Sequence, residues 1–138
     1  PGVCGCGNHG CLEQVASANG IVRLARWMME EKGEIRTSID TESMSSKDIW
    51  DAVKAGDAFA MEVAERFGKY LGLALANIAS TVEPEVFVLG GGVSKQARAF
   101  WTILRNIMCS TRSEAAGTQD SCWLPWATTR GSTVRRNW

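Results

Sequence analysis

The sequence lacks several features that mark particular classes of protein. Basic and acidic residues balance at 15 each, so the formal net charge is zero, and there is no basic surplus to favour nucleic acid or an anionic membrane surface. No apolar run approaches the roughly 18 residues needed to cross a bilayer, and no basic stretch followed by an apolar one marks a signal peptide. We therefore expect a cytoplasmic protein that acts on neither nucleic acid nor membranes.

Histidine is scarce, and the cysteines are unevenly placed. The chain has one histidine, His9, and five cysteines, three of them in the stretch CGCGNHGCLE at residues 4–13. The odd count disfavours a disulfide framework, and the absence of C-x-x-C disfavours a redox pair. Glycine-spaced thiols favour a metal site on Cys4, Cys6 and Cys11 over three unligated thiols. Structural zinc often takes three cysteines and one histidine, so His9 is either the fourth ligand or a loop residue.

A carboxylate follows these cysteines directly. Glu13 stands two residues after Cys11, at the expected start of a helix, where the helix dipole favours a negative charge. One interpretation is a simple capping charge. The other is a ligand-binding residue whose position the metal loop fixes, and the residues alone leave both open.

Apolar spacing predicts a helical segment after the cysteine loop. Apolar residues recur at intervals of three and four over residues 12–32. Asn19 and Gly20 are expected to divide this segment into two helices, and Gly33 is expected to end the second one. Residues 33–44 are polar and are predicted to form a loop.

Two further helices are predicted. Ser45 stands three residues before Asp48, which resembles a capping box opening a helix that ends near Gly56. A long helix is expected over residues 57–82, and Pro84 ends it because proline cannot continue a helix.

An apolar run and three glycines come after that proline. Residues 86–89 suit a buried strand, and a helix is expected to begin near Ser94. Between them lie Gly90, Gly91 and Gly92. A strand, a glycine turn and a helix can hold a phosphate group, because backbone N–H groups can approach the anion. A tight turn without a ligand fits the motif equally well.

Two segments together resemble the ROK family, which comprises repressors, open reading frames and sugar kinases. CGCGNHGCLE is similar to the family's cysteine signature, CxCGxxGCxE, and LANIASTVEPEVFVLGGGVS is similar to a later helix, strand and glycine turn. EQVASANGIVRLA also resembles the segment after the signature in the family's bacterial glucokinases. The resemblance covers about residues 1–95. It implies an α/β, actin-like (ribonuclease-H-like) ATPase fold, with residues 1–95 as a partial domain that includes a zinc-binding loop.

The resemblance implies a structural Zn²⁺ ion held by Cys4, Cys6 and Cys11. The family's fourth ligand is a histidine that precedes the signature, in an E-x-G-H motif. His9 occupies a variable position of the signature and is therefore interpreted as a loop residue.

The resemblance also implies an ATP-dependent hexose kinase, with glucose the favoured hexose, that is a homo-oligomer when full length. Glu13 would hydrogen-bond sugar hydroxyls, and the glycines at 90–92 would lie against ATP bound with Mg²⁺. The family's D-x-G-x-T phosphate loop and catalytic aspartate are absent from this sequence, so no catalytic residue is assigned, and we expect the chain to be inactive alone. The alternatives are the sugar-sensing domain of a ROK transcriptional repressor, or the inactive product of a broken gene.

The quoted motifs end near Lys95. Residues 96–138 hold four of the six tryptophans and show no clear period. No domain is assigned to them, and Cys109 and Cys122 are not counted as ligands. When each codon's last base is read with the next two bases, the chain from Cys122 onward permits LATLGNDAGIYGAAKL, which resembles the LGNDAGIYGAA ending of ROK kinases. We hypothesise a reading-frame shift near residues 95–97.

Overall fold

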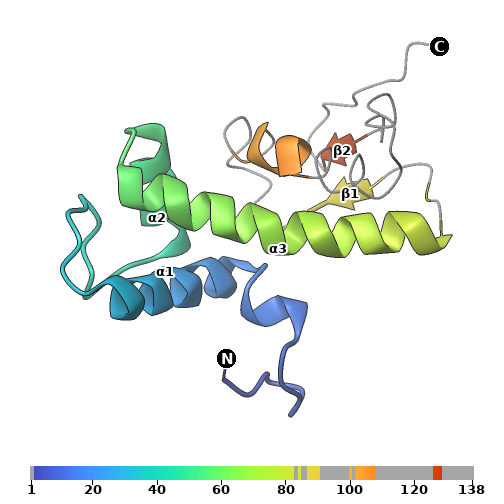
Figure 1. Ribbon diagram of the computed structural model, residues 1–138, viewed down its shortest axis with the longest axis horizontal. Helices are drawn as coiled ribbons and strands as arrows, with labels where there is room; N and C mark the ends of the chain where they lie inside the picture. Colours follow the sequence, from blue (N-terminus) through green and yellow to red (C-terminus); the bar gives the residue numbers. More distant parts are fainter. Residues whose placement is uncertain are drawn as a thin grey trace. The chain divides into compact units, whose positions relative to one another are not determined.

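The computed structural model describes residues 2–82, 84, 87–90, 100, 102–107 and 126–128. Its elements are a 3-10 turn η1 (Leu12–Gln14), helices α1 (Ala18–Lys32), α2 (Ser46–Lys54) and α3 (Ala58–Val82), and strands β1 (Phe87–Leu89) and β2 (Trp126–Thr128) (Figure 1). The chain divides into two compact units, Pro1–Leu71 and Gly72–Trp138. Among the helices that the structure describes, none is long and apolar enough to cross a membrane.

The interruption between η1 and α1 differs from the prediction. Asn19 and Gly20 do not divide two helices; both lie in the first turn of α1, and the break precedes them. Ser17 causes the break, because its Oγ accepts a hydrogen bond from the Gly20 N–H (2.9 Å) and donates one to the Glu13 carbonyl (2.8 Å). A serine N-cap of this kind satisfies a backbone donor that the helix leaves unpaired. Gly33, with φ of 76°, follows the last residue of α1 as predicted.

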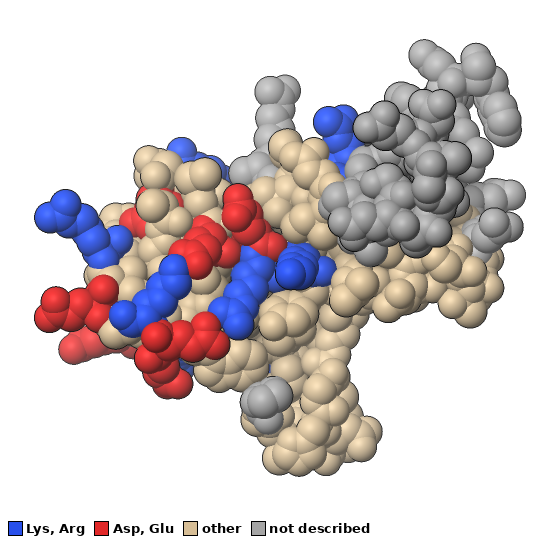
Figure 2. Space-filling view, viewed as in Figure 1, with Lys and Arg blue, Asp and Glu red and all other residues tan. Residues whose placement is uncertain are grey.

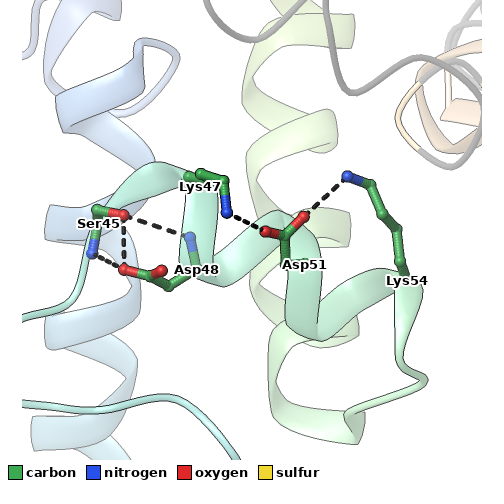
Figure 3. A network of polar contacts seen from close by, with 5 residues as sticks. All are labelled: Ser45, Lys47, Asp48, Asp51 and Lys54. Atoms are coloured by element: carbon green, nitrogen blue, oxygen red, sulfur yellow. Dashed lines mark hydrogen bonds and ion pairs between the residues drawn. The ribbon is translucent and has the colours of Figure 1, made fainter.

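Helix α2 begins at the predicted capping box. The Ser45 Oγ accepts from the Asp48 N–H (3.3 Å), while the Asp48 carboxylate accepts from the Ser45 N–H (2.9 Å) and hydroxyl (2.6 Å) (Figure 3). On the outer face, Asp51 pairs with Lys47 at 2.7 Å and with Lys54 at 2.9 Å. Such exposed pairs contribute little free energy, so the cap and the apolar inner face define this helix.

The first unit has an apolar core between its helices. Trp50 of α2 meets Phe67 of α3 edge to face, with ring centroids 6.0 Å apart and planes at 90°, an arrangement that aromatic rings favour. The most completely buried of its other large side chains, each less than 2% exposed, are Ile21, Leu24, Met28, Ile49 and Val63. Their spacing of three and four residues along α1 and α3 is the pattern that predicted the helices.

Two ion pairs on the surface connect the end of α1 to α3. Lys32 pairs with Glu62 at 2.5 Å, and Arg66 pairs with Glu31 at 2.7 Å. Figure 2 shows the acidic and basic side chains of this face intermingled rather than segregated by sign. This surface therefore offers no extended field of one charge to attract a polyanion, consistent with the zero net charge of the sequence.

The polar loop at 33–44 is tied to the start of α3 by one carboxylate. Asp57 accepts hydrogen bonds from the Ser38 N–H (2.7 Å) and hydroxyl (2.9 Å), the Thr37 hydroxyl (3.1 Å) and the Ala60 N–H (2.9 Å). Partial burial acts to raise the pKa of Asp57, but these hydrogen bonds outweigh it and lower the pKa to about 2. The ionised form therefore stabilises this corner of the fold.

We expect Asp57→Asn to cost the first unit at most about 2 kcal/mol at neutral pH. Because the pKa of Asp57 falls from its ordinary value of 3.8 to about 2 on folding, its stabilisation is complete above about pH 4 and is lost as the pH falls toward 2. Denaturant unfolding of both proteins between pH 7 and pH 2 measures this, with Glu42→Gln as an exposed control. An equal loss of stability in wild type and Asp57→Asn below pH 4 would refute the assignment.

The second unit contains a parallel strand pair. In the register of β1 and β2, Phe87 lies opposite Trp126 and Leu89 opposite Thr128. Parallel pairing of strands far apart in sequence is typical of α/β architecture. A helical segment at 102–107 precedes β2. This helical segment and β2 both lie in residues 96–138, to which no domain was assigned. Part of that region therefore has secondary structure, while the absence of a domain assignment stays a prediction.

Candidate functional site

The three predicted metal ligands lie together in the cysteine loop. The Sγ atoms of Cys4, Cys6 and Cys11 all lie within 4.8 Å of one another, and those of Cys6 and Cys11 are 3.5 Å apart. All three are free thiols. Tetrahedral zinc with Zn–S bonds of about 2.3 Å places its sulfur ligands about 3.8 Å apart. The donor set and spacing therefore fit a thiophilic divalent ion.

Local hydrogen bonds and two glycines fold this loop back on itself. The Cys4 N–H donates to the Asn8 carbonyl and the Gly7 N–H donates to the Cys4 carbonyl, both at 2.8 Å. Gly7 and Gly10 have φ of 84° and 74°, which side chains of L-residues disfavour. The glycines of the signature thus allow the reversal that brings the thiols together.

Two of the three thiols have a shifted pKa. A hydrogen bond from the Cys6 backbone, followed by those of the Gln14 and Cys6 side chains, lowers the pKa of Cys4 to about 7. Hydrogen bonds to Cys6 and then Cys4 raise the pKa of Cys11 to about 11, because Cys11 keeps its proton to donate. Of these two thiols, Cys4 therefore ionises at the lower pH.

His9 is exposed and lies outside the thiol cluster. Of the histidine, cysteine and acidic side chains that the structure describes, Cys4, Cys6 and Cys11 form the one group of three or more that could hold a metal ion. This arrangement is compatible with His9 as a loop residue. The identity of the fourth ligand stays a prediction.

Glu13 lies in η1, immediately after the cluster, and its side chain is exposed. Its backbone is held by the Ser17 hydroxyl, while its carboxylate makes no hydrogen bond or ion pair with the described part of the chain. The oxygens of this carboxylate are therefore free to accept hydrogen bonds from a ligand.

The predicted phosphate-binding turn is only partly described. Gly90 follows β1 and is exposed, whereas Gly91 and Gly92 lie outside the described residues. The parallel β1–β2 pair ends at this turn. The contribution of these glycines to a nucleotide site stays a prediction.

Sequence reasoning did not identify Gln14. This residue is only 4% exposed, and its backbone N–H donates to the Cys11 carbonyl (2.9 Å). The sequence feature that could have indicated it was its position between Leu12 and Val15, in the first turn after Cys11. A polar residue there faces either solvent or the metal loop, and periodicity alone does not distinguish the two.

Comparison with known proteins assigns the chain to a family. The model of the ROK family matches residues 1–122. The chain belongs to the ROK family. The match runs beyond Lys95, where the motifs quoted from the sequence end. Most of the described structure lies inside the matched range, namely residues 2–82, 84 and 87–90.

Relatives in the ROK family include kinases and a regulator. The chain is 45% identical to the glucokinase of Halalkalibacterium halodurans over 95 residues, which cover 67% of this chain and 29% of that protein. Its structure resembles a ROK glucokinase from Streptomyces griseus in complex with glucose and AMPPNP, with a TM-score of 0.70, 29% identity, and 78% and 36% of the two chains covered. It also resembles a ROK transcriptional regulator homologous to Escherichia coli MLC, with a TM-score of 0.59, 32% identity, and coverage of 82% and 29%.

These likenesses support the predicted fold class. The Streptomyces griseus neighbour is a ROK sugar kinase, a class with an actin-like ATPase fold, and the part of this chain described by the structure is a mostly helical portion of it. The chain spans about a third of the length of the relatives that it matches.

Proposed function

We propose that this ROK chain is the sugar- and zinc-binding part of an ATP-dependent hexose kinase, with glucose as the hexose. The observation that carries the proposal is the convergence of three thiols immediately before a free, exposed glutamate. The 45% identity to a glucokinase supports the reaction class. The likeness to a structure that holds glucose and AMPPNP supports sugar and ATP as ligands.

In this proposal, zinc has a structural role and the chain's own carboxylate recognises the sugar. Cys4, Cys6 and Cys11 hold the ion, which fixes the loop leading into η1. Glu13, at the start of that turn, accepts hydrogen bonds from sugar hydroxyls, and bonds of this kind to an ionised acceptor are stronger than neutral ones. The glycines at 90–92 contribute to binding ATP with Mg²⁺ when the kinase is complete and oligomeric.

Phosphoryl transfer depends on positioning and on charge stabilisation around the transferred group. The family's phosphate loop and catalytic aspartate are not in this sequence. We therefore propose that the chain binds ligands but does not phosphorylate a hexose by itself.

A glucose titration of the zinc-loaded chain tests the sugar contact. We expect Glu13→Gln, which keeps the shape but loses the charge, to weaken glucose binding by roughly 10-fold or more, as for hydrogen bonds to charged groups. Glu34→Gln, an exposed acid of the 33–44 loop, serves as the control. N-acetylglucosamine, N-acetylmannosamine and fructose complete the panel. Equal glucose affinity in wild type and Glu13→Gln would remove Glu13 from the site.

A second candidate function is the sugar-sensing domain of a ROK transcriptional repressor. The likeness to the MLC-homologous regulator supports it. AMPPNP titration with Mg²⁺ separates the two candidates: the kinase proposal expects nucleotide and sugar to bind, whereas the sensor proposal expects sugar alone.

For residues 96–138 we retain the reading-frame shift as a proposal, which would make the chain the product of a broken gene. The family match reaches residue 122, which argues against a shift as early as residues 95–97. The gene sequence decides whether the reading frame shifts, because codons that cannot spell LGNDAG in the shifted frame would exclude the shift.

A further inference from the structure

The proposed sugar contact stands on an element that is too short to be stable by itself. Glu13 lies in η1, a 3-10 turn of three residues. Hydrogen-bond geometry in such turns is poorer than in α-helices, so a single turn needs support from its surroundings. The carboxylate of Glu13 is exposed and has no hydrogen-bond or ion-pair partner in the described part of the chain. Its position is therefore set by the backbone of η1.

Two contacts from α1 converge on one backbone atom of that turn, the carbonyl oxygen of Glu13. The Ser17 hydroxyl donates to this oxygen at 2.8 Å. Gly20 is buried and so close that a Cβ on it would lie 3.0 Å from the same oxygen. Further along the same helix, Ile21 and Leu24 are 0% and 1% exposed. The backbone of η1 is thus attached to a helix whose own position is fixed by the apolar core.

Ser17 makes two different hydrogen bonds with one hydroxyl group. Its Oγ accepts from the Gly20 N–H at 2.9 Å, which caps α1, and it donates its own proton to the Glu13 carbonyl. The cap requires only an acceptor, whereas the bond to Glu13 requires a donor. A side chain that accepts without donating therefore separates capping of α1 from attachment of η1.

We propose that Ser17 is a positioning residue for sugar binding: its donated hydrogen bond holds the backbone of Glu13 against α1, so that the free carboxylate meets the sugar hydroxyls in one place. This inference rests on the proposed sugar contact of Glu13 and is independent of the nucleotide. Of the two residues, Glu13 touches the sugar, and Ser17 acts through it. A carboxylate that is not held in place binds more weakly, because its ordering then costs conformational entropy at the moment of binding.

Glucose titration of the zinc-loaded full chain, combined with denaturant unfolding of each variant, tests this role. We expect Ser17→Ala to weaken glucose binding about 5-fold or more, as for loss of a hydrogen bond, and to lower the unfolding midpoint because the cap is lost. Ser17→Asp should weaken glucose binding to a similar degree but keep the midpoint near that of wild type, since an ionised aspartate caps a helix without donating. Ser17→Thr, which can both accept and donate, should restore both properties.

Two control variants test for indirect effects. Ser45→Ala removes the capping serine of α2, so it should lower the unfolding midpoint without changing glucose affinity. Ala18→Asp adds the same negative charge as Ser17→Asp at an exposed neighbouring position and leaves the Ser17 hydroxyl in place, so it should bind glucose like wild type. If either control lost as much glucose affinity as the Ser17 variants, lowered stability or added charge would explain the loss and the proposal would be wrong.

The remaining outcomes separate this inference from the proposed function. If wild type binds no glucose, or Glu13→Ala binds it equally well, the sugar contact is wrong and the role of Ser17 is wrong with it. If Glu13→Ala loses affinity while Ser17→Asp stays within about twofold of wild type, the cap suffices and the role of Ser17 alone is wrong. In a Glu13→Ala chain, Ser17→Ala should weaken binding by at most about twofold further. A full additional loss there would show that Ser17 does not act through Glu13.

Discussion

Cys11→Ser is expected to abolish stoichiometric zinc binding by this chain. The Cys11 sulfur lies 3.5 Å from that of Cys6 and within 4.8 Å of that of Cys4, so its loss leaves two of the three thiol donors. A serine hydroxyl is a hard donor that keeps its proton at neutral pH, and it replaces a thiolate poorly at a soft metal site. Zinc content after purification should fall from about one ion per chain to near zero.

The chain supplies its own controls for this experiment. Cys109 and Cys122 lie in the tail and are not assigned as ligands, so Cys109→Ser and Cys122→Ser should retain wild-type zinc content. Wild-type zinc in Cys11→Ser would contradict the ligand assignment. Loss of zinc in either tail variant would mean that the ligand set is different from the one proposed.

Gly20→Ala is expected to destabilise the first unit, although alanine is the better helix former by about 1 kcal/mol. A Cβ at this position would lie 2.8 Å from the Val15 carbonyl carbon and 3.0 Å from the Glu13 carbonyl oxygen. Both are backbone atoms, so the connection between η1 and α1 must move to admit the methyl group. Overpacking of this kind typically costs about 1–3 kcal/mol, which exceeds the gain in helix propensity.

Denaturant unfolding of Gly20→Ala measures this cost, and Asn19→Ala is its matched control. Asn19 is exposed in the same turn of α1. The control therefore gains helix propensity without a steric clash against the backbone of η1. A Gly20→Ala chain as stable as wild type would show that the close approach of η1 to α1 is not a constraint. Glucose affinity should fall with stability, because the shifted backbone is that of Glu13.

Local sequence signals predicted most of the first unit. The capping box at Ser45, the glycine end of α1 at Gly33 and the start of α3 after Asp57 all depend on interactions within a few residues. The break before α1 was misplaced, because the Ser17 cap and the close packing of Gly20 on η1 depend on a backbone approach that periodicity does not encode.

The sequence predicted some residues of the candidate site and not others. The spacing of Cys4, Cys6 and Cys11 indicated a shared metal, and the structure places their sulfurs together. Gln14 could not be assigned, because hydrophobic periodicity does not predict the burial of a polar residue, and this one is 4% exposed. The role of Glu13 came from the family resemblance rather than from the residue alone.

The measurement that most directly tests the central claim, a metal centre in the cysteine loop, is X-ray absorption at the zinc edge of the zinc-loaded chain. We predict a first shell dominated by sulfur, with about three atoms at about 2.3 Å. A shell of nitrogen and oxygen atoms alone, at about 2.0–2.2 Å, would contradict the account, because it would place the ion away from Cys4, Cys6 and Cys11.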